Sequence, residues 1–261
     1  MSWITLLLIT LTSLILIDHL GSRRLRKRVR GWAAALFAQA KEQPALSAQE
    51  TPGGIRSRDA LPQQTVRLKV KGARRSTPVK GWIPLEGKIF VAPGRPAVAF
   101  YADLTRWAFF SQKEILYLDE KELHAQRFLF SVLAQKVHFT RDNVRALLLA
   151  GLPWWPSLLS HPDLELRQRE AAVFAVRWAD ATASTEVDWH LDKKNRWKRA
   201  VITWPDEQDT TFELHVTDYR TFDNWEIPGK LSVVPAGMTS EAAVLTIQLT
   251  EWIANEPYHW W

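Results

Sequence analysis

The segment VDWHLDKKNRWKRAVIT, residues 187–203, has the pattern of two strands joined by a tight turn. Apolar and polar side chains alternate from Val187 to Leu191, which is the period of a half-buried strand. Residues 192–196 contain Asp and Asn, which favour a chain reversal. The returning strand alternates in the same way, with apolar Ala200, Ile202 and Trp204. The segment therefore predicts an antiparallel hairpin with one apolar face.

The same alternation continues on both sides of this hairpin. Residues 66–71 alternate apolar with basic side chains, and residues 212–216 extend the hairpin into a meander. Further strands are expected near residues 88–92, 97–110, 114–119, 125–139, 171–178, 230–234 and 243–253. An antiparallel sheet with one apolar face needs a cover on that face. The pattern predicts a mainly β domain over residues 63–261.

One helix in this domain is expected to provide the cover. Thr140 is suited to its N-cap, and Asp142 lies in its first turn. Pro153 and Pro156 end or kink it. Its apolar stripe is predicted to comprise Val144, Leu147, Leu148, Leu152 and Trp155.

The amino-terminal segment WITLLLITLTSLILIDHL, residues 3–20, is almost entirely apolar. Eighteen helical residues extend about 27 Å, which is near the thickness of a bilayer core. A cleaved signal peptide carries basic residues before its apolar core, whereas here they follow it. The segment predicts a transmembrane anchor over residues 1–22.

Six basic residues follow this segment immediately and predict its orientation. Basic residues beside a span stay on the cytoplasmic side, so the large domain is expected in the cytoplasm, with the extracytoplasmic side as the alternative. Apolar residues from Leu25 to Ala40 recur at helical spacing, which predicts an amphipathic helix over residues 23–42. Its stripe packs either on anionic headgroups or on the protein's own body. The residues predicted at the membrane interface are Arg23, Arg24, Arg26, Lys27, Arg28, Arg30 and Trp32.

Composition excludes several classes of function. The formal net charge of +6 equals the charge of the six basic residues between Arg23 and Arg30, so the high pI does not indicate nucleic-acid binding. A second basic patch, from Arg67 to Lys80, is interpreted as the solvated face of a strand. The chain has no cysteine, which excludes disulfides, thiolate catalysis and cysteine-bound metals. Residues 43–62 are rich in Pro and Gly and are predicted to form a linker.

Catalytic and cofactor motifs are not found. The chain lacks a phosphate-binding glycine loop, a nucleophile elbow and a zinc-binding helix motif. Its seven histidines do not form a pair at metal-ligand spacing. Glu86 lies between apolar residues, and an inward-facing ion pair with Arg127 or Arg177 is favoured over a catalytic acid. We therefore expect no metal, no cofactor and no enzymatic activity.

The fourteen tryptophans indicate either a large aromatic core or an aromatic-lined hollow. As core packing they need no further function. As walls of a hydrophobic cavity they would suit a lipid or an acyl chain. The tryptophans predicted to bind such a ligand are Trp82, Trp107, Trp154, Trp155, Trp178, Trp189 and Trp204.

Several short motifs resemble the layout of an uncharacterised bacterial domain family. They are Trp82-x-Pro84-x-Glu86, the run from Trp154 to Leu159, Trp178 and Ile227-Pro228. The resemblance covers about residues 60–255 and implies a fold similar to the half-barrel of LolA and LolB, a curved antiparallel sheet wrapped around helices. It also implies a hydrophobic-ligand site inside that half-barrel. Ala150-Gly151 stands where the family has an acidic residue, so no role of that carboxylate is carried over.

These observations predict a single-pass protein of the bacterial inner membrane. Its anchor and basic helix are expected to precede a linker and a LolA/LolB-like half-barrel covered by one or two helices. The predicted function is binding of a lipid-like or other hydrophobic ligand without catalysis. The alternative is a scaffold domain with a fully packed core, a protein partner and no small-molecule ligand.

Overall fold

The computed structural model describes residues 3–41, 64–75, 81–94, 96–106, 110–137, 139–179, 186–203, 210–222 and 225–255. The predicted linker over residues 43–62 lies outside these ranges, as do Trp107 and Trp204.

The described strands form one large antiparallel sheet that does not close on itself. Its order is β6-β5-β4-β3-β2-β1-β13-β12-β11-β10-β9-β8-β7, which leaves β6 and β7 at opposite edges. The mainly β prediction is confirmed. The strands are β1 (Val66–Arg75), β2 (Trp82–Ala92), β3 (Ala97–Arg106), β4 (Phe110–Leu118), β5 (Leu123–Leu129), β6 (Leu133–Lys136), β7 (Leu164–Glu170), β8 (Val173–Trp178), β9 (Val187–Leu191), β10 (Trp197–Thr203), β11 (Thr211–Phe222), β12 (Trp225–Pro235) and β13 (Leu245–Ala254).

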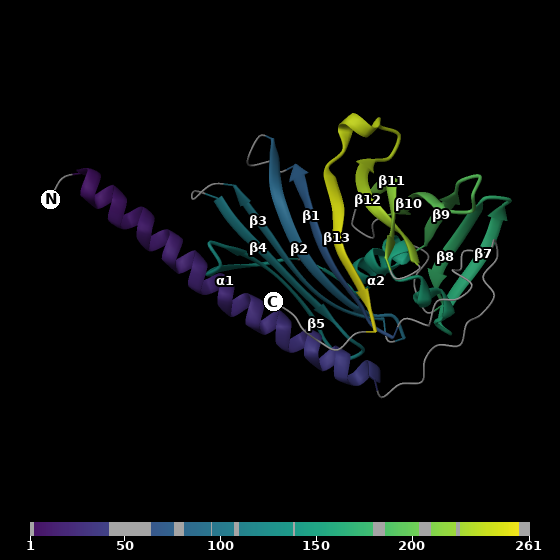
Figure 1. Ribbon diagram of the computed structural model, residues 1–261, viewed down its shortest axis with the longest axis horizontal. Coiled ribbons are helices and arrows are strands. Elements are labelled where there is room, and N and C mark those ends of the chain that lie inside the picture. The colour runs from purple at the N-terminus through teal and green to yellow at the C-terminus, as the bar shows by residue number, and fades with distance from the viewer. Residues whose placement is uncertain are drawn as a thin grey trace.

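The chain builds this sheet as two meanders that meet at its centre. The first runs outward from β1 to the edge strand β6, and the second runs inward from the edge strand β7 to β13. Pairing of β1 with β13 joins the two meanders. The segment between β6 and β7 must therefore cross from one edge to the other. Figure 1 shows the sheet curving around this crossover, which contains α2.

The crossover comprises α2 (Arg141–Ala150) and the short 3-10 helices η1 (Leu152–Trp154) and η2 (Pro156–Ser160). Thr140 caps α2 as predicted: its hydroxyl accepts from the Asn143 amide, and the Asn143 side chain accepts from the Thr140 amide. The helix ends earlier than predicted, before Gly151. Leu147, predicted in the apolar stripe, is 42% exposed.

Indole hydrogen bonds attach the crossover to strands of the second meander. Trp154 Nε1 donates to the carbonyl of Pro228 in β12 at 2.8 Å, and Trp252 Nε1 in β13 donates to the carbonyl of Trp154 at 2.7 Å. Trp189 Nε1 in β9 donates to the Leu149 carbonyl at 3.1 Å. The bond from Trp252 gives a partner to the Trp154 carbonyl at the end of η1, and the bond from Trp189 adds a second donor to the Leu149 carbonyl in the last turn of α2. The inner face of the sheet is therefore filled by a crossover held in one position.

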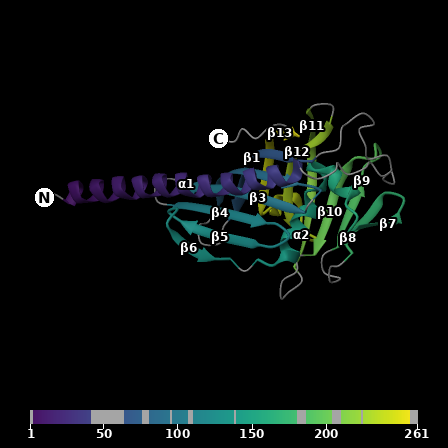
Figure 2. The same cartoon turned by 90° about the horizontal axis from the view of Figure 1, so that it is seen from below.

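A long helix, α1 (Trp3–Lys41), lies on the outer face of the sheet and contacts β2, β3 and β4. Its stripe from Leu25 to Ala40 is buried against a second apolar cluster that includes Phe90, Ile115 and Tyr117. Of the two alternatives for this stripe, packing on the protein's own body is the one observed. Figures 1 and 2 show α1 crossing the outer face and its amino-terminal part extending beyond the strands.

The predicted transmembrane span is wrong. Across the described residues, α1 included, no helical stretch is both long enough and apolar enough to cross a bilayer. The helix does not end near residue 22, as an anchor followed by a separate helix would, but continues to Lys41. Asp18, within the predicted span, binds Ser111 and Ser131 of the domain. The predicted single-pass location in the bacterial inner membrane is therefore overturned as well.

The contact between α1 and the β5–β6 turn is close. A Cβ atom at Gly21 would lie 2.6 Å from the Cβ of Ser131, so only glycine allows this approach. Ser131 has a positive φ of 57°, and its hydroxyl lies 2.9 Å from that of Ser22. The backbone conformation of the turn thus places Ser131 in direct contact with α1.

This contact predicts an engineered crosslink. In a chain with no native cysteine, the double variant Ser22→Cys/Ser131→Cys should form an intramolecular disulfide under mild oxidation, because the two hydroxyls are adjacent. Mass spectrometry with thiol labelling measures the outcome. The pair Ser22→Cys/Ser240→Cys, whose second site is in the distant 3-10 helix η4 (Ser240–Ala242), should keep both thiols. Two free thiols in the first variant would show that α1 is not docked there.

The crossover predicts a matched pair of glycine substitutions. At Gly151 a Cβ would lie 1.9 Å from the Trp155 ring, which is buried. Gly151→Ala should therefore lower the free energy of unfolding by about 1–3 kcal/mol through overpacking. Gly31 on α1 has no atom within 4 Å of such a Cβ, so Gly31→Ala should stabilise by up to about 1 kcal/mol. Urea unfolding measures both, and equal effects would contradict the packing.

Candidate binding groove between the first helix and the sheet

The outer face of β2, β3 and β4 is apolar at one end of the strands and polar at the other. In β3 the outward residues Ala97, Ala99 and Tyr101 are followed by Asp103 and Thr105. In β4 the outward positions of Ser111 and Lys113 precede those of Ile115 and Tyr117. The carboxyl-terminal half of α1 covers the apolar part, because burying its stripe there removes apolar surface from water. The polar part lies beneath residues 14–26 of α1.

Strand register places four charged residues in one row across this polar part. Lys71 of β1 is opposite Glu86 of β2, Glu86 is opposite Asp103 of β3, and Asp103 is opposite Lys113 of β4. Lys71 pairs with Glu86 at 3.2 Å. Lys113 pairs with Asp103 at 2.6 Å. Neighbouring strands thus supply both partners of each pair.

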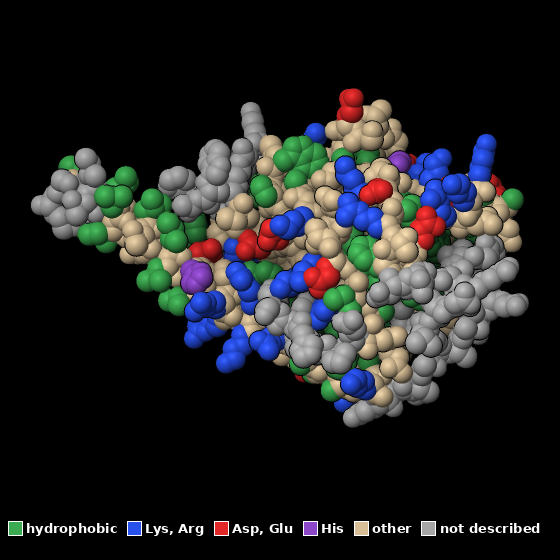
Figure 3. Space-filling view, in the orientation of Figure 1, with side chains coloured by type: hydrophobic (Ala, Val, Ile, Leu, Met, Phe, Trp, Pro, Cys, Tyr) green, Lys and Arg blue, Asp and Glu red, His purple; other side chains and the backbone are tan. Residues whose placement is uncertain are grey.

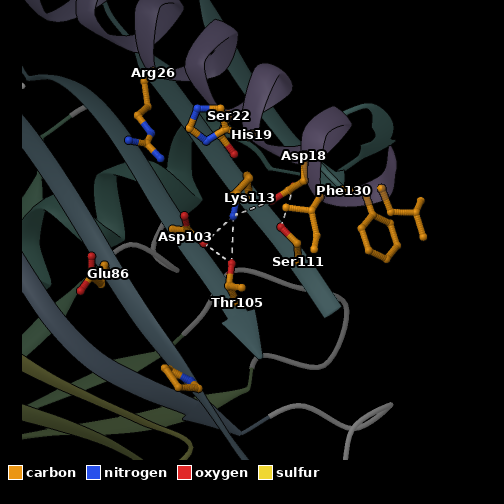
Figure 4. Close-up of a pocket in the computed structure, with 13 residues that line it drawn as sticks. Asp18, His19, Ser22, Arg26, Glu86, Asp103, Thr105, Ser111, Lys113 and Phe130 are labelled. Carbon is orange, nitrogen blue, oxygen red and sulfur yellow. Dashed lines mark hydrogen bonds and ion pairs between the residues drawn. The ribbon is translucent and has the colours of Figure 1, made fainter. Parts of the chain in front are cut away.

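Lys113 is the centre of a network that connects α1 to the sheet. Its side chain is only 2% exposed. Its Nζ donates to Asp103 and to Thr105, the latter at 2.9 Å, and lies 3.7 Å from Asp18 Oδ2. Asp18 in turn accepts from the hydroxyls of Ser111 and Ser131, each at 2.7 Å. Figure 4 shows Lys113 between Asp103 on the sheet and Asp18 on the helix. The buried ammonium is therefore compensated by carboxylates from two elements.

A cavity of about 580 Å³ opens beside this network, between α1 and the sheet. Its apolar side is formed by Leu14, Ile15, Pro84 and Phe130. Its polar side contains the Lys113 network, together with His19, Arg26 and Glu86. Figure 3 shows charged side chains gathered around a hollow beside α1. We call this cavity the groove.

A second cavity of about 220 Å³ shares three lining residues with the groove: Arg26, Glu86 and Asp103. It is bordered by further cations, Lys69, Lys71 and Lys88, and by Tyr101. Burial, with added repulsion from Lys69 and Arg26, lowers the pKa of Lys88 to about 8. Burial also raises the pKa of Tyr101 to about 12. We call this second cavity the basic pocket.

Four of the tryptophans predicted to bind a ligand lie in the packed inner core. Trp154, Trp155, Trp178 and Trp189 are between 0% and 4% exposed. Trp155 Nε1 donates to the Leu148 carbonyl at 2.8 Å, and the indoles of Trp154 and Trp189 are bonded as described above. Neither the groove nor the basic pocket is lined by any of the four. Their arrangement is that of a core cluster with α2 and the strands around it.

Trp82 is placed differently from these four. It begins β2, is 37% exposed, and has the Arg75 guanidinium 5.0 Å from its ring centroid. Trp107 and Trp204, also predicted to bind a ligand, lie outside the described residues.

Residues predicted at a membrane interface lie on α1 and in part contact the sheet. Trp32 stacks on Tyr117 and His124, with ring centroids 5.1 and 5.8 Å apart. Arg28 donates to Gln126 at 3.1 Å. Arg26 lines both the groove and the basic pocket. The remaining predicted positions, Arg23, Arg24, Lys27 and Arg30, are exposed on the helix.

Glu86 does not face the inner core. Its side chain is 69% exposed on the outer face, and it pairs with Lys71. The two arginines proposed as its partners bind other carboxylates: Arg127 pairs with Glu114 at 2.9 Å, and Arg177 pairs with Glu165 at 2.6 Å. The prediction of an inward-facing ion pair is therefore wrong, because Glu86 has the opposite strand phase from buried Leu85.

The residues that form the groove were largely missed by the sequence analysis. Asp18, Asp103, Ser111 and Lys113 are separated in the sequence, and each alone resembles a solvated residue. A signal was nevertheless present. The outward phase of β3 and β4 carries apolar residues at one end and polar residues at the other, and Asp18 interrupts an apolar run of the helix. The apolar end of this outer face requires a covering element, which is α1. The same helix then places its own polar residues over the polar end of the face.

Solved structures with a similar arrangement of strands have little sequence identity to this chain. No curated protein matches it in sequence. Similar solved structures include a putative outer membrane lipoprotein-sorting protein domain from Vibrio parahaemolyticus, at 8% identity and a TM-score of 0.44, which covers 75% of this chain and 87% of that one. A DUF1329 family protein from Desulfovibrio piger has 9% identity and a TM-score of 0.46, with 90% and 95% covered. A LolA superfamily protein from Nitrosomonas europaea has 9% identity and a TM-score of 0.41, with 79% and 91% covered.

The resemblance to an uncharacterised family is confirmed by a sequence match. Residues 58–236 match the family described as "Family of unknown function (DUF6544)". The matched region begins before β1 and ends just after β12, so it includes the crossover and most of the sheet. The chain belongs to this family of unknown function.

Proposed function

We propose that this protein binds a lipid-like, amphipathic ligand in the groove, without catalysis. The observation that carries the proposal is the groove's division into two sides. Leu14, Ile15 and Phe130 offer an apolar surface at one side, while charged residues of α1 and the sheet line the other. A volume of about 580 Å³ is within the range of small-molecule sites.

The groove is favoured over the inner core as the ligand site because the core is filled by packed side chains, whereas the groove is open. The tryptophans of the inner core are buried against the crossover, and three of them donate to backbone carbonyls. A ligand there would have to displace close-packed side chains. In the groove, by contrast, a tail can lie against the helix and the β5–β6 turn while its headgroup reaches the charged residues.

Binding rather than catalysis is proposed because of how the buried groups are paired. Lys113 is held by Asp103 and Asp18, and both carboxylates accept further hydrogen bonds from hydroxyl groups. Such mutual pairing gives each of the three groups its partners within the protein and favours a structural role.

The second candidate function is a scaffold domain with a protein partner. The packed inner core around Trp178 and Trp189, each at most 1% exposed, favours this candidate. A protein of this kind would need no small molecule in the groove. The two candidates are distinguished by whether the groove binds an amphiphile.

Filling the groove should abolish ligand binding. Pro84 lies on the outer face of β2, is exposed and lines the groove, and the hydrogen bonds and ion pairs of Lys113 are made with other residues. The full-length protein should bind octyl phosphate, used below its micelle concentration, in isothermal titration calorimetry. Pro84→Trp should weaken this binding at least about tenfold, equivalent to about 1.4 kcal/mol, because the indole occupies the space of the tail.

The control places the same side chain elsewhere. Lys198 is exposed on β10, in the other meander, so Lys198→Trp should leave binding unchanged. Thermal unfolding of both variants checks that each is folded. Absence of binding by the unmodified protein, or equal binding by the folded Pro84→Trp variant, would refute the proposed site and favour the scaffold.

A further inference from the structure

Two lysines face each other on neighbouring strands of the outer face. Lys69 of β1 is directly opposite Lys88 of β2 in the strand register. Side chains in this relation have Cβ atoms about 4.5–5.5 Å apart, and like charges placed so are destabilising. Arg26 approaches the same place from α1, since it borders the same pocket as both lysines. Three cations from three elements thus converge on one small cavity.

The carboxylates around this pocket are already paired with cations, and one of those cations is Lys69 itself. Glu251 of β13 binds Lys69 and lies 3.6 Å from Arg67. Glu86 pairs with Lys71, and Asp103 pairs with Lys113. The charged and titratable groups that face Lys88 are Arg26 from α1, Arg67, Lys69 and Lys71 from β1, Glu86 from β2, Tyr101 and Asp103 from β3, and Glu251 from β13. Cations outnumber carboxylates in this set.

We propose that the basic pocket binds the anionic headgroup, a phosphate or similar oxyanion, of the ligand whose tail occupies the groove. This inference rests on the proposed function and names the chemistry of its ligand. The two cavities share the lining residues Arg26, Glu86 and Asp103, so they adjoin each other under α1. An oxyanion between Lys69, Lys88 and Arg26 replaces repulsion among the cations with charge-assisted hydrogen bonds.

The buried phenol of Tyr101 adds a neutral donor to this site. It lies on β3 opposite Lys88, is 4% exposed, and has the Arg26 guanidinium 5.9 Å from its ring centroid. Because burial raises its pKa to about 12, its hydroxyl keeps its proton in neutral and mildly alkaline solution. A protonated phenol donates to an oxyanion and adds no competing negative charge.

Lys88 makes the headgroup site dependent on pH. Its pKa of about 8 in the unliganded protein means that it is charged at neutral pH and loses its proton in mildly alkaline solution. A bound anion favours the charged form, so binding and protonation of Lys88 reinforce each other. The second pKa of a phosphate monoester is about 6, so the ligand's own charge stays constant above neutrality. Affinity should therefore fall as pH rises through the pKa of Lys88.

The test compares octyl phosphate, octyl glucoside and inorganic phosphate as ligands of the full-length protein, by calorimetry below the micelle concentrations. Octyl phosphate should bind at least about tenfold more tightly than either of the others, a difference of about 1.4 kcal/mol. Lys88→Met should remove most of this preference, whereas Lys88→Arg, which keeps the charge, should retain it. Lys198→Met, at an exposed lysine of β10, is the matched control and should bind like the unmodified protein.

The pH dependence of binding distinguishes a ligand-binding Lys88 from a purely structural one, because a structural role alone predicts no change in affinity with the protonation of Lys88. Between about pH 7.5 and about pH 9.5 the affinity of the unmodified protein for octyl phosphate should fall about tenfold, through linkage to Lys88. The Lys88→Arg variant should show little change, because arginine stays protonated over this range.

Each alternative result has a distinct meaning. If octyl phosphate and octyl glucoside bind equally, or if Lys88→Met binds like the unmodified protein, the headgroup site is refuted while ligand binding in the groove stands. If inorganic phosphate binds as tightly as octyl phosphate, the pocket serves a free anion and the link to a tail is refuted. If neither amphiphile binds, both this inference and the proposed function are refuted.

Discussion

The apolar outer face of β2, β3 and β4 is the constraint on which the rest of the structure depends. These strands carry buried residues on both faces, such as Val91 and Phe90 on β2. The crossover fills the inner face, so a second element must cover the outer one. The stripe of α1 from Leu25 to Ala40 meets that need. Because α1 is straight and longer than the apolar patch, it also extends over the polar ends of the same strands, and the groove lies there.

The polar network under α1 fixes the helix at a second place. Apolar packing alone would leave α1 some freedom to slide along the sheet, because different sets of apolar contacts have similar energies. Lys113 and Asp18 reduce that freedom, because separating them would leave a buried ammonium with less compensation. Gly21 adds a steric condition, as only a residue without a side chain allows the helix to approach Ser131 so closely. The groove therefore lies next to the apolar stripe, and the network that fixes the helix forms part of its lining.

Local features of this fold could be predicted from the sequence, whereas the relations between distant segments could not. The hairpin of residues 187–203 and the Thr140 cap depend on neighbours in the chain, and both are confirmed. β7 was missed because five of its seven residues are charged or amide side chains at an edge, where little apolar surface is buried. Lys113 was not identified from the sequence, because its helical partner Asp18 is far away along the chain. The apolar run of residues 3–20 was interpreted by composition alone, without the sheet on which the same helix packs.

The charge distribution of the outer face favours a ligand over a purely structural role for the basic pocket. Lys88 has its pKa lowered in the folded protein, whereas an unfolded chain would keep it near 10.5. Between about pH 8 and pH 10.5, Lys88 therefore binds more protons in the unfolded state than in the folded state. As pH rises through that window, the contribution of Lys88 to the free energy of unfolding becomes more favourable to the folded state. At neutral pH the charged lysine is thus a cost to folding. An apolar or neutral residue opposite Lys69 would avoid that cost, and an anion bound beside Arg26 would offset it. A cost of this kind, placed at the end of a groove with an apolar side, is expected where recognition of charge matters more than stability.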